Sequence, residues 1–182
     1  IGLARLLPDG SFDPSFGTSG KASVMLGPSW CRPASDVLIQ PDGRIIVCAS
    51  AVPDSLVFSD YATAVLRFKS NGALDSTFSD DGKLILNLLR PGDENGNSLA
   101  LQSDGKIILA GAVETTTTDG WTLTRLLPNG SLDPSFALSG SNKYFGAQLQ
   151  EIALQPDGKI VAVGSTGGGQ AIAARFSANG AY

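Results

Sequence analysis

A stretch of eleven residues recurs three times, and this repetition constrains the fold more than any other feature of the sequence. The copies are Ile39–Ala49, Leu101–Gly111 and Leu154–Gly164. Each contains an apolar segment, then Gln-Pro/Ser-Asp-Gly-Lys/Arg, then a second apolar segment. Pro presets the first corner of a tight turn, Asp tolerates the second, and Gly adopts the left-handed conformation that closes it. We predict a β-hairpin at each copy and name residues 40–44, 102–106 and 155–159 the glutamine turns.

The length of the glutamine turn determines which residues face each other across the hairpin. A three-residue loop closed by a left-handed glycine places Gln40 opposite Arg44 and Ile39 opposite Ile45. The same register applies to the other two copies. The second strand of each hairpin is almost wholly apolar, which is typical of a strand buried on both faces. The pattern therefore favours sheets that are stacked face to face.

A second motif, which we name the arginine hairpin, alternates with the first. It runs from an arginine through a glycine-containing turn to Asp-x-Ser/Thr-Phe, and its copies start at Arg5, Arg67, Arg125 and, without the last part, Arg175. The turn length places each arginine opposite the aspartate eight residues later, which predicts the structural pairs Arg5–Asp13, Arg67–Asp75 and Arg125–Asp133. Facing opposite charges stabilise a hairpin by ~0.2–1 kcal/mol. A ligand carboxylate or phosphate at each arginine is the alternative, and it is less favoured because each arginine has its own partner.

The two motifs combine into a repeat of four strands, A to D, in which the glutamine turn joins A to B and the arginine hairpin joins C to D. The arginines are 62, 58 and 50 residues apart, and periods of this size are typical of solenoids, propellers or arrays. No segment has a helical period. We predict an all-β fold, namely a β-propeller or an open arc of blades, with four-stranded antiparallel blades in tandem. A parallel β-helix is a distant alternative because it has shorter coils and fewer hairpins.

We expect a single repeat domain of about three and a half blades. The predicted division is a partial blade of C and D strands (1–34), two blades (35–97 and 98–146) and an incomplete blade (147–182). Ile1 is not a start methionine, so the chain is expected to be a processed or partial product. An open arc would leave apolar blade faces uncovered, which favours self-association through blade edges.

The alternation of Leu-Gln-Pro-Asp-Gly-Lys-Ile with Arg-Leu-x-x-Asn-Gly-Ser-Leu-Asp-x-Ser-Phe resembles the bacterial delta-60 repeat β-propellers. The resemblance extends over essentially the whole chain, since both motifs recur in the right order. Two departures are Ser103 in place of the turn proline and residues 137–140 in place of Gly-x-x-Gly. The resemblance implies a secreted or cell-surface bacterial protein. It implies no particular activity.

Function is expected on the connections that vary between copies, because binding residues concentrate on loops of a rigid scaffold. The A–B and C–D turns keep their residue types and form what we name the turn face, whereas the variable B–C and D–A connections form the loop face. Aromatic rings there suit stacking on a sugar, and charged groups suit hydrogen bonds to hydroxyls. The candidate ligand-binding residues are Trp30, Arg32, Asp54, Tyr61, Asp93, Glu94, Glu114, Asp119 and Trp121. The alternative for any one of them is an ordinary solvated loop or an aromatic cap on a blade edge.

These observations favour a non-enzymatic extracellular binding or adhesion module that recognises a glycan or protein. A structural repeat that assembles into a fibre or surface layer is the second hypothesis. The chain has no histidine, so the usual general base, the usual metal ligand and the Ser–His triad are all missing. A carboxylate-pair glycosidase, with Asp93 or Glu94 and Glu114, ranks last.

Other partners are not expected. The net charge is −4 and the basic residues do not cluster, so nucleic acid is an unfavourable partner. No apolar run approaches the ~18 residues of a membrane span. Asp75, Asp80 and Asp81 supply oxygen atoms of the kind calcium binds, but the matching turns lack them, so we expect no metal and no cofactor.

The two cysteines are Cys31 and Cys48. Cys48 occupies the position of Ala110 and Val163 in the other copies, so a small buried thiol is the simplest interpretation. In the hairpin register Cys48 lies opposite Asp36, which is five residues after Cys31. A disulfide between the two cysteines is therefore the alternative.

Overall fold

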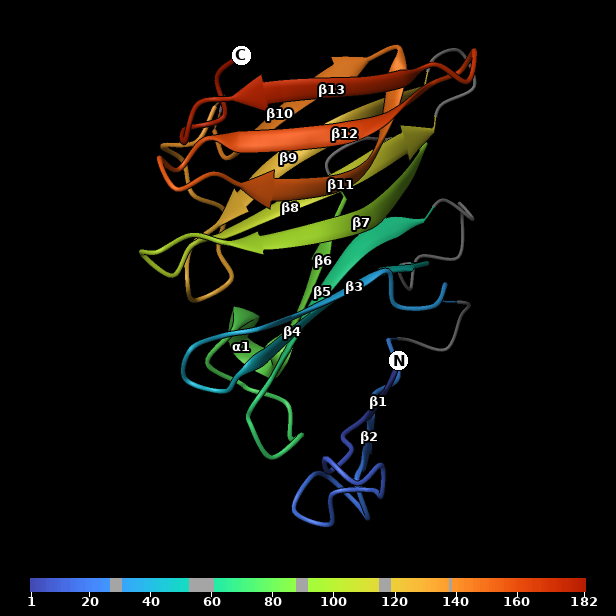
Figure 1. The fold of residues 1–182 in the computed structure, drawn as a ribbon, viewed down its shortest axis with the longest axis vertical. Coiled ribbons are helices and arrows are strands. Elements are labelled where there is room, and N and C mark those ends of the chain that lie inside the picture. Colours follow the sequence, from blue (N-terminus) through green and yellow to red (C-terminus); the bar gives the residue numbers. More distant parts are fainter. Residues whose placement is uncertain (27–30, 53–60, 88–91, 115–118, 138) are drawn as a thin grey trace.

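The computed structural model describes residues 1–26, 31–52, 61–87, 92–114, 119–137 and 139–182, and these residues form four antiparallel sheets. The sheets follow one another along the long axis of the molecule, from the N-terminus to the C-terminus (Figure 1). The predicted all-β architecture of tandem antiparallel blades is confirmed. Within the described residues no sheet closes on itself, and the first and last sheets lie at opposite ends of the stack.

Each sheet is built from consecutive strands. The first holds β1 (Gly2–Ala4) and β2 (Lys21–Ser23). The second holds β3 (Asp36–Ile39), β4 (Ile45–Ala51), β5 (Ala62–Phe68) and β6 (Lys83–Leu86), with a short helix α1 (Ser79–Gly82) before β6. The third holds β7 (Asp93–Leu101), β8 (Ile107–Glu114), β9 (Asp119–Leu126) and β10 (Ser141–Phe145). The fourth holds β11 (Ala147–Leu154), β12 (Ile160–Thr166) and β13 (Ala171–Phe176).

The glutamine turns have the predicted register. Ile39 pairs with Ile45, and the backbone N–H of Gln40 donates to the carbonyl of Arg44 at 2.8 Å. Gly43 has a φ of 82°, which glycine adopts without the steric cost that a side chain would bring. The Asp42 carboxylate accepts the backbone N–H of Arg44 at 3.0 Å. The turn is therefore stabilised locally, by residues that recur in each copy.

The third sheet begins earlier than the sequence predicts. We expected a boundary between residues 97 and 98, but β7 already starts at Asp93. The strand contains a β-bulge between Gly96 and Ser98, and its first half, Asp93–Asn97, is polar. A bulged polar strand has neither an apolar run nor a regular alternation, so its sequence resembles a loop.

The core consists of three apolar clusters, one between each pair of neighbouring sheets. Representative buried residues are Phe16, Val47 and Leu66 in the first cluster, Ile46, Phe78 and Leu109 in the second, and Leu123, Phe136 and Phe176 in the third. Every residue of β4 and β5 is buried, because neighbouring sheets cover both faces of these strands. Stacked sheets bury both faces, as the continuous apolar runs indicated.

Both cysteines are free, so the disulfide that the sequence left open does not form. Cys48 is fully buried, and the loss of solvation raises the pKa of its thiol to about 12. It is therefore an unreactive core residue. Within the described residues, no helix combines the length and the apolar composition that crossing a bilayer requires.

Candidate functional site: the loop face

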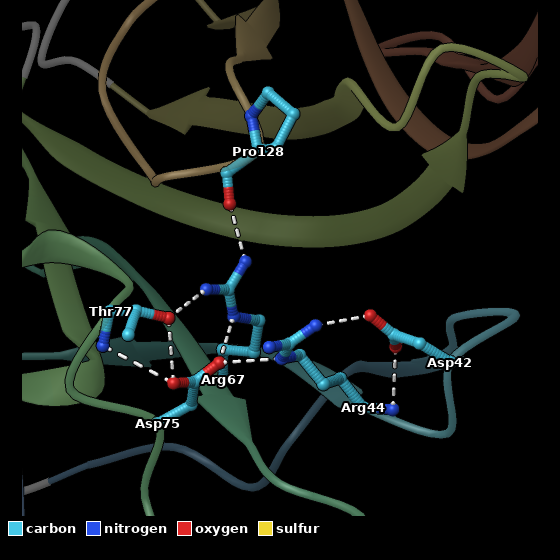
Figure 2. Close-up of polar contacts among 6 residues, drawn as sticks. All are labelled: Asp42, Arg44, Arg67, Asp75, Thr77 and Pro128. Atoms are coloured by element: carbon cyan, nitrogen blue, oxygen red, sulfur yellow. Dashed lines mark hydrogen bonds and ion pairs between the residues drawn. The ribbon is translucent and has the colours of Figure 1, made fainter.

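The arginine hairpins connect neighbouring sheets as well as their own strands. Figure 2 shows the second copy, in which Arg67 donates to Asp75 at 2.8 Å and to the Thr77 hydroxyl at 2.9 Å. A third N–H of the same guanidinium donates to the carbonyl of Pro128 in the third sheet (Figure 2). Arg5 reaches the Ser70 carbonyl, and Arg125 reaches the Ala178 carbonyl, in the same way. Each arginine thus joins its own hairpin to the turn of the next sheet.

The phenylalanine of the motif completes this connection. The Phe78 ring lies against Gly130 of the next sheet, where an added Cβ would be 3.0 Å from the ring. The backbone N–H of Ser79 donates to the carbonyl of Asn129 at 2.9 Å. The Arg67 guanidinium lies 4.9 Å from the centre of the Phe78 ring, a favourable cation–π distance. We name this unit the inter-sheet staple, and its residues are engaged in holding the stack together.

The staple also determines the protonation of its carboxylates. Burial raises the pKa of Asp75, but the hydrogen bonds from Thr77 and the charge of Arg67 outweigh it, and the net pKa is below the usual value. In the third sheet, the Ser135 hydroxyl is the main cause that lowers the pKa of Asp133 to about 2. Both aspartates are therefore ionised at neutral pH, as partners of an arginine require.

On the loop face, three of the candidate residues meet at the junction of the second and third sheets. The Arg32 guanidinium lies 4.3 Å from the centre of the Tyr61 ring and 3.9 Å from the Asp93 carboxylate. The backbone N–H of Tyr61 donates to the other Asp93 oxygen at 2.8 Å. We name these residues the Arg32 cluster. They come from three separate chain segments, so only the fold brings them together.

The acidic candidates occupy neighbouring positions beside this cluster. Asp93 on β7 faces Glu114 on β8, and Glu114 in turn faces Asp119 on β9. Glu114 is exposed, whereas Glu94 is buried and its backbone N–H donates to the Tyr61 carbonyl at 2.8 Å. Like charges at directly facing positions destabilise a sheet. The facing of Asp93 and Glu114 therefore costs some stability, whereas the contacts of Asp93 with Arg32 and with the Tyr61 N–H are stabilising. The side chain of Asp119 lies outside what the structure describes.

The remaining candidates do not belong to this surface. Trp121 is 5% exposed, and its ring stacks on Tyr144 with centres 4.1 Å apart. It packs between the third and fourth sheets, so it is a core residue and not a platform for a ligand. Trp30 and Asp54 lie outside the described residues. The described residues contain no group of three His, Cys, Asp or Glu side chains placed to hold a metal ion.

Sequence reasoning missed one feature, which lies on the turn face. The side-chain oxygens of Gln40, Gln102 and Gln155 are buried, and none has a hydrogen-bond partner among the described residues. The three-fold recurrence of the glutamine was visible in the sequence. The burial of its oxygen was not, because that depends on how the side chain packs in the folded chain.

Stacked antiparallel sheets of up to four strands, joined by repeated staples, are the arrangement of β-propeller blades. A family model described as "Domain of unknown function (DUF5122) beta-propeller" matches residues 1–16, 40–78, 102–136 and 155–181, which together make up more than half of the chain. The chain belongs to this family. The curated proteins compared with it include no match. The matched segments contain the turns and arginine hairpins, whereas Arg32 and Asp93 fall between them.

Proposed function

We propose that this chain is a non-enzymatic binding module that recognises a glycan or protein through the Arg32 cluster and the neighbouring acids of its loop face. The observation that carries the proposal is the convergence of Arg32, Tyr61 and Asp93 at one sheet junction. The side chain of Arg32 is 46% exposed and that of Asp93 is 28% exposed. Their charged groups are therefore within reach of a ligand.

The cluster suits binding for two physical reasons. The Arg32 guanidinium is held in place by the Tyr61 ring and the Asp93 carboxylate. A ligand that bonds to it therefore causes little further loss of side-chain entropy. The row of acids at Asp93 and Glu114 supplies acceptors for hydroxyl or amine donors. The staples also hold an arginine between a ring and an aspartate, but there the pair is buried: the side chains of Arg67 and Asp75 are 6% and 1% exposed.

We also propose that the repeats are of the delta-60 type and that the protein acts outside a bacterial cell or on its surface. Support comes from the ordered alternation of glutamine turns and arginine hairpins along the chain. Detection of the native protein in the culture medium or the surface fraction tests this localisation. Recovery only from the cytoplasm contradicts it.

The binding proposal is tested on a glycan array and with extracellular matrix proteins, using the wild-type chain and two variants. Arg32→Ala should weaken binding at least tenfold. Lys159→Ala, which removes an exposed charge from the turn face, should leave it unchanged. Equal binding by all three chains overturns the proposal. Release of reducing sugar that Glu114→Gln abolishes would replace it with the glycosidase hypothesis.

A second function, self-assembly, is favoured by apolar side chains exposed at two places: on the second sheet, which the two-stranded first sheet leaves partly uncovered, and on the last sheet of the stack. Val37 and Ile39 on β3 are 55% and 71% exposed, whereas Leu99, at the position of Val37 in the next sheet, is 6% exposed. On the last sheet Val163 on β12 is 42% exposed, whereas the equivalent Cys48 is fully buried. Both places therefore present apolar side chains at positions that a neighbouring sheet covers elsewhere in the chain.

Light scattering over a concentration series tests this second function. Self-assembly predicts a mass that rises with concentration and returns to that of a monomer in Val163→Glu. Ala181→Glu places the same charge at an exposed position in the turn after β13, outside the strands, and it should leave the mass unchanged. A constant monomer mass for the wild-type chain rules out self-assembly.

A further inference from the structure

The turn face contains a groove between the second and third sheets, at the opposite ends of the strands from the Arg32 cluster. Its volume is about 530 Å³, which lies within the range of roughly 300–1,000 Å³ that is usual for small-molecule sites. The two glutamine turns form its sides, and Arg67 and Pro128 of the inter-sheet staple also line it. Figure 2 shows this region from Asp42 across Arg67 to Pro128. We name it the turn-face groove.

Gln40 and Gln102 line the groove, and their side-chain oxygens have no hydrogen-bond donor among the described residues. Gln40 is 8% exposed. A buried carbonyl oxygen without a donor is unfavourable, and a methionine of similar size would avoid this cost. The backbone N–H of each glutamine already bonds within its own turn. The Gln102 side-chain amide donates one long bond, 3.5 Å, to the Ala178 carbonyl of the fourth sheet, but this bond leaves the side-chain oxygen without a donor. The same unpaired oxygen recurs at Gln155. The unpaired oxygen is therefore a shared property of the repeat and not a peculiarity of Gln40.

The charged groups of the groove are already paired with one another. Arg44 bonds to both Asp42 and Asp75, and Arg67 bonds to Asp75 (Figure 2). On the other side Lys106 pairs with Asp104 at 2.9 Å. The groove therefore offers no uncompensated charge, and it does not favour a strongly ionic ligand. Hydrogen-bonding groups of the groove include the remaining N–H groups of Arg44 and the Ser103 hydroxyl, with the buried glutamine oxygens beneath its surface.

Apolar surface lies between these polar groups. Pro41, Leu101 and Pro128 contribute carbon atoms to the lining. A ligand that fits has C–H surface and groups that both donate and accept hydrogen bonds, and sugars and cyclitols combine the two. Because the Gln40 oxygen is buried, binding of such a ligand requires a change of side-chain rotamer that turns the amide toward the groove.

We propose that the turn-face groove binds a neutral polyhydroxylated ligand, a sugar or cyclitol, whose hydroxyls donate to Gln40 and Gln102 and accept from Arg44. The site is separate from the loop face and does not rest on the function proposed there. Because the same glutamine recurs in the fourth sheet, the next junction carries the elements of a second site of the same kind.

The proposal is tested by NMR on the ¹⁵N-labelled chain, titrated with galactose, N-acetylglucosamine and myo-inositol at millimolar concentrations. At least one of the three should shift the side-chain amide signals of Gln40 and Gln102. Arg32→Ala should show the same shifts, which separates this site from the loop face. Absence of any shift, or a shift with the diamine putrescine and none of the three, overturns the proposal.

Gln40→Met distinguishes a binding glutamine from a structural one. If the amide serves a ligand, the variant unfolds at the same or a higher temperature than wild type and binds the sugar at least tenfold more weakly. Gln150→Met makes the same change at an exposed position and should alter neither property. A lower unfolding temperature for both Gln40→Met and a second variant, Gln102→Met, would show that the glutamines are structural, and the proposal fails.

Discussion

Loss of the staple arginine should cost far more in the second sheet than in the first, although the contacts are the same. Arg67 and Arg5 each bond to an aspartate, a hydroxyl and a carbonyl of the next sheet. The Arg67 and Asp75 side chains are 6% and 1% exposed, whereas those of Arg5 and Asp13 are 36% and 15% exposed. Replacement by methionine in each case keeps the apolar part of the side chain and removes the charge.

The expected magnitudes follow from burial. Removing one partner of a buried ion pair leaves the other charge in the interior and costs roughly 3–5 kcal/mol. Arg44 still contacts Asp75 at 2.9 Å, so we expect about 3 kcal/mol for Arg67→Met. An exposed pair contributes about 0.2–1 kcal/mol, so Arg5→Met should cost about 1 kcal/mol. The predicted difference in the free energy of unfolding is about 2 kcal/mol.

Urea unfolding, followed by circular dichroism, measures this difference. With a slope of roughly 2 kcal/mol per molar urea, the midpoint of Arg67→Met should fall by about 1.5 M and that of Arg5→Met by about 0.5 M. Equal costs at the two positions would refute the argument that burial of the pair, rather than its contacts, determines its contribution to stability.

Three further predictions concern the same staples. Ala137 has a φ of 47°, and left-handed backbone costs a residue with a side chain about 1–2 kcal/mol. Glycine avoids this cost but loses about 0.5–1 kcal/mol more in backbone entropy on folding, so Ala137→Gly should raise the melting temperature by about 1–4 °C; a melting temperature below that of wild type would contradict the strain. Gly180→Ala should destabilise the protein more than the control Gly10→Ala in urea unfolding. Both glycines have positive φ, but a Cβ at Gly180 would lie 2.4 Å from the Phe136 ring, whereas nothing lies within 4 Å of a Cβ at Gly10. The pKa of Asp133 is lowered to about 2 from 3.8, which stabilises the fold by about 1–2 kcal/mol above pH ~4, and this stabilisation is lost as the pH falls toward 2. In melting curves recorded from pH 2 to 6, Asp133→Asn should therefore lose less stability on acidification than wild type. An unchanged pH dependence in the variant would contradict the role of this carboxylate.

The sequence by itself determined the local pairing of strands. Turn length sets the register of a hairpin, so the facing of Ile39 with Ile45 and of Arg67 with Asp75 could be predicted from spacing alone. The apolar second strands also predicted sheets covered on both faces. These properties depend on residues close together in the chain, and for that reason a single sequence suffices to predict them.

Only the tertiary structure decided which of these residues are buried and what they meet across sheets. Trp121 follows a variable connection in the sequence, but stacking of the fourth sheet on the third makes it a core residue. Arg67 bonds to the carbonyl of Pro128, which is 61 residues away in the sequence. Arg32 likewise contacts Tyr61 and Asp93 from a distant part of the chain. No local sequence pattern predicts such contacts. The polar segment from Asp93 is a strand because it pairs with β8 on both sides of a β-bulge. Contacts between sheets depend on how whole sheets stack, and that arrangement follows from the sum of many side-chain contacts rather than from the spacing of any one motif.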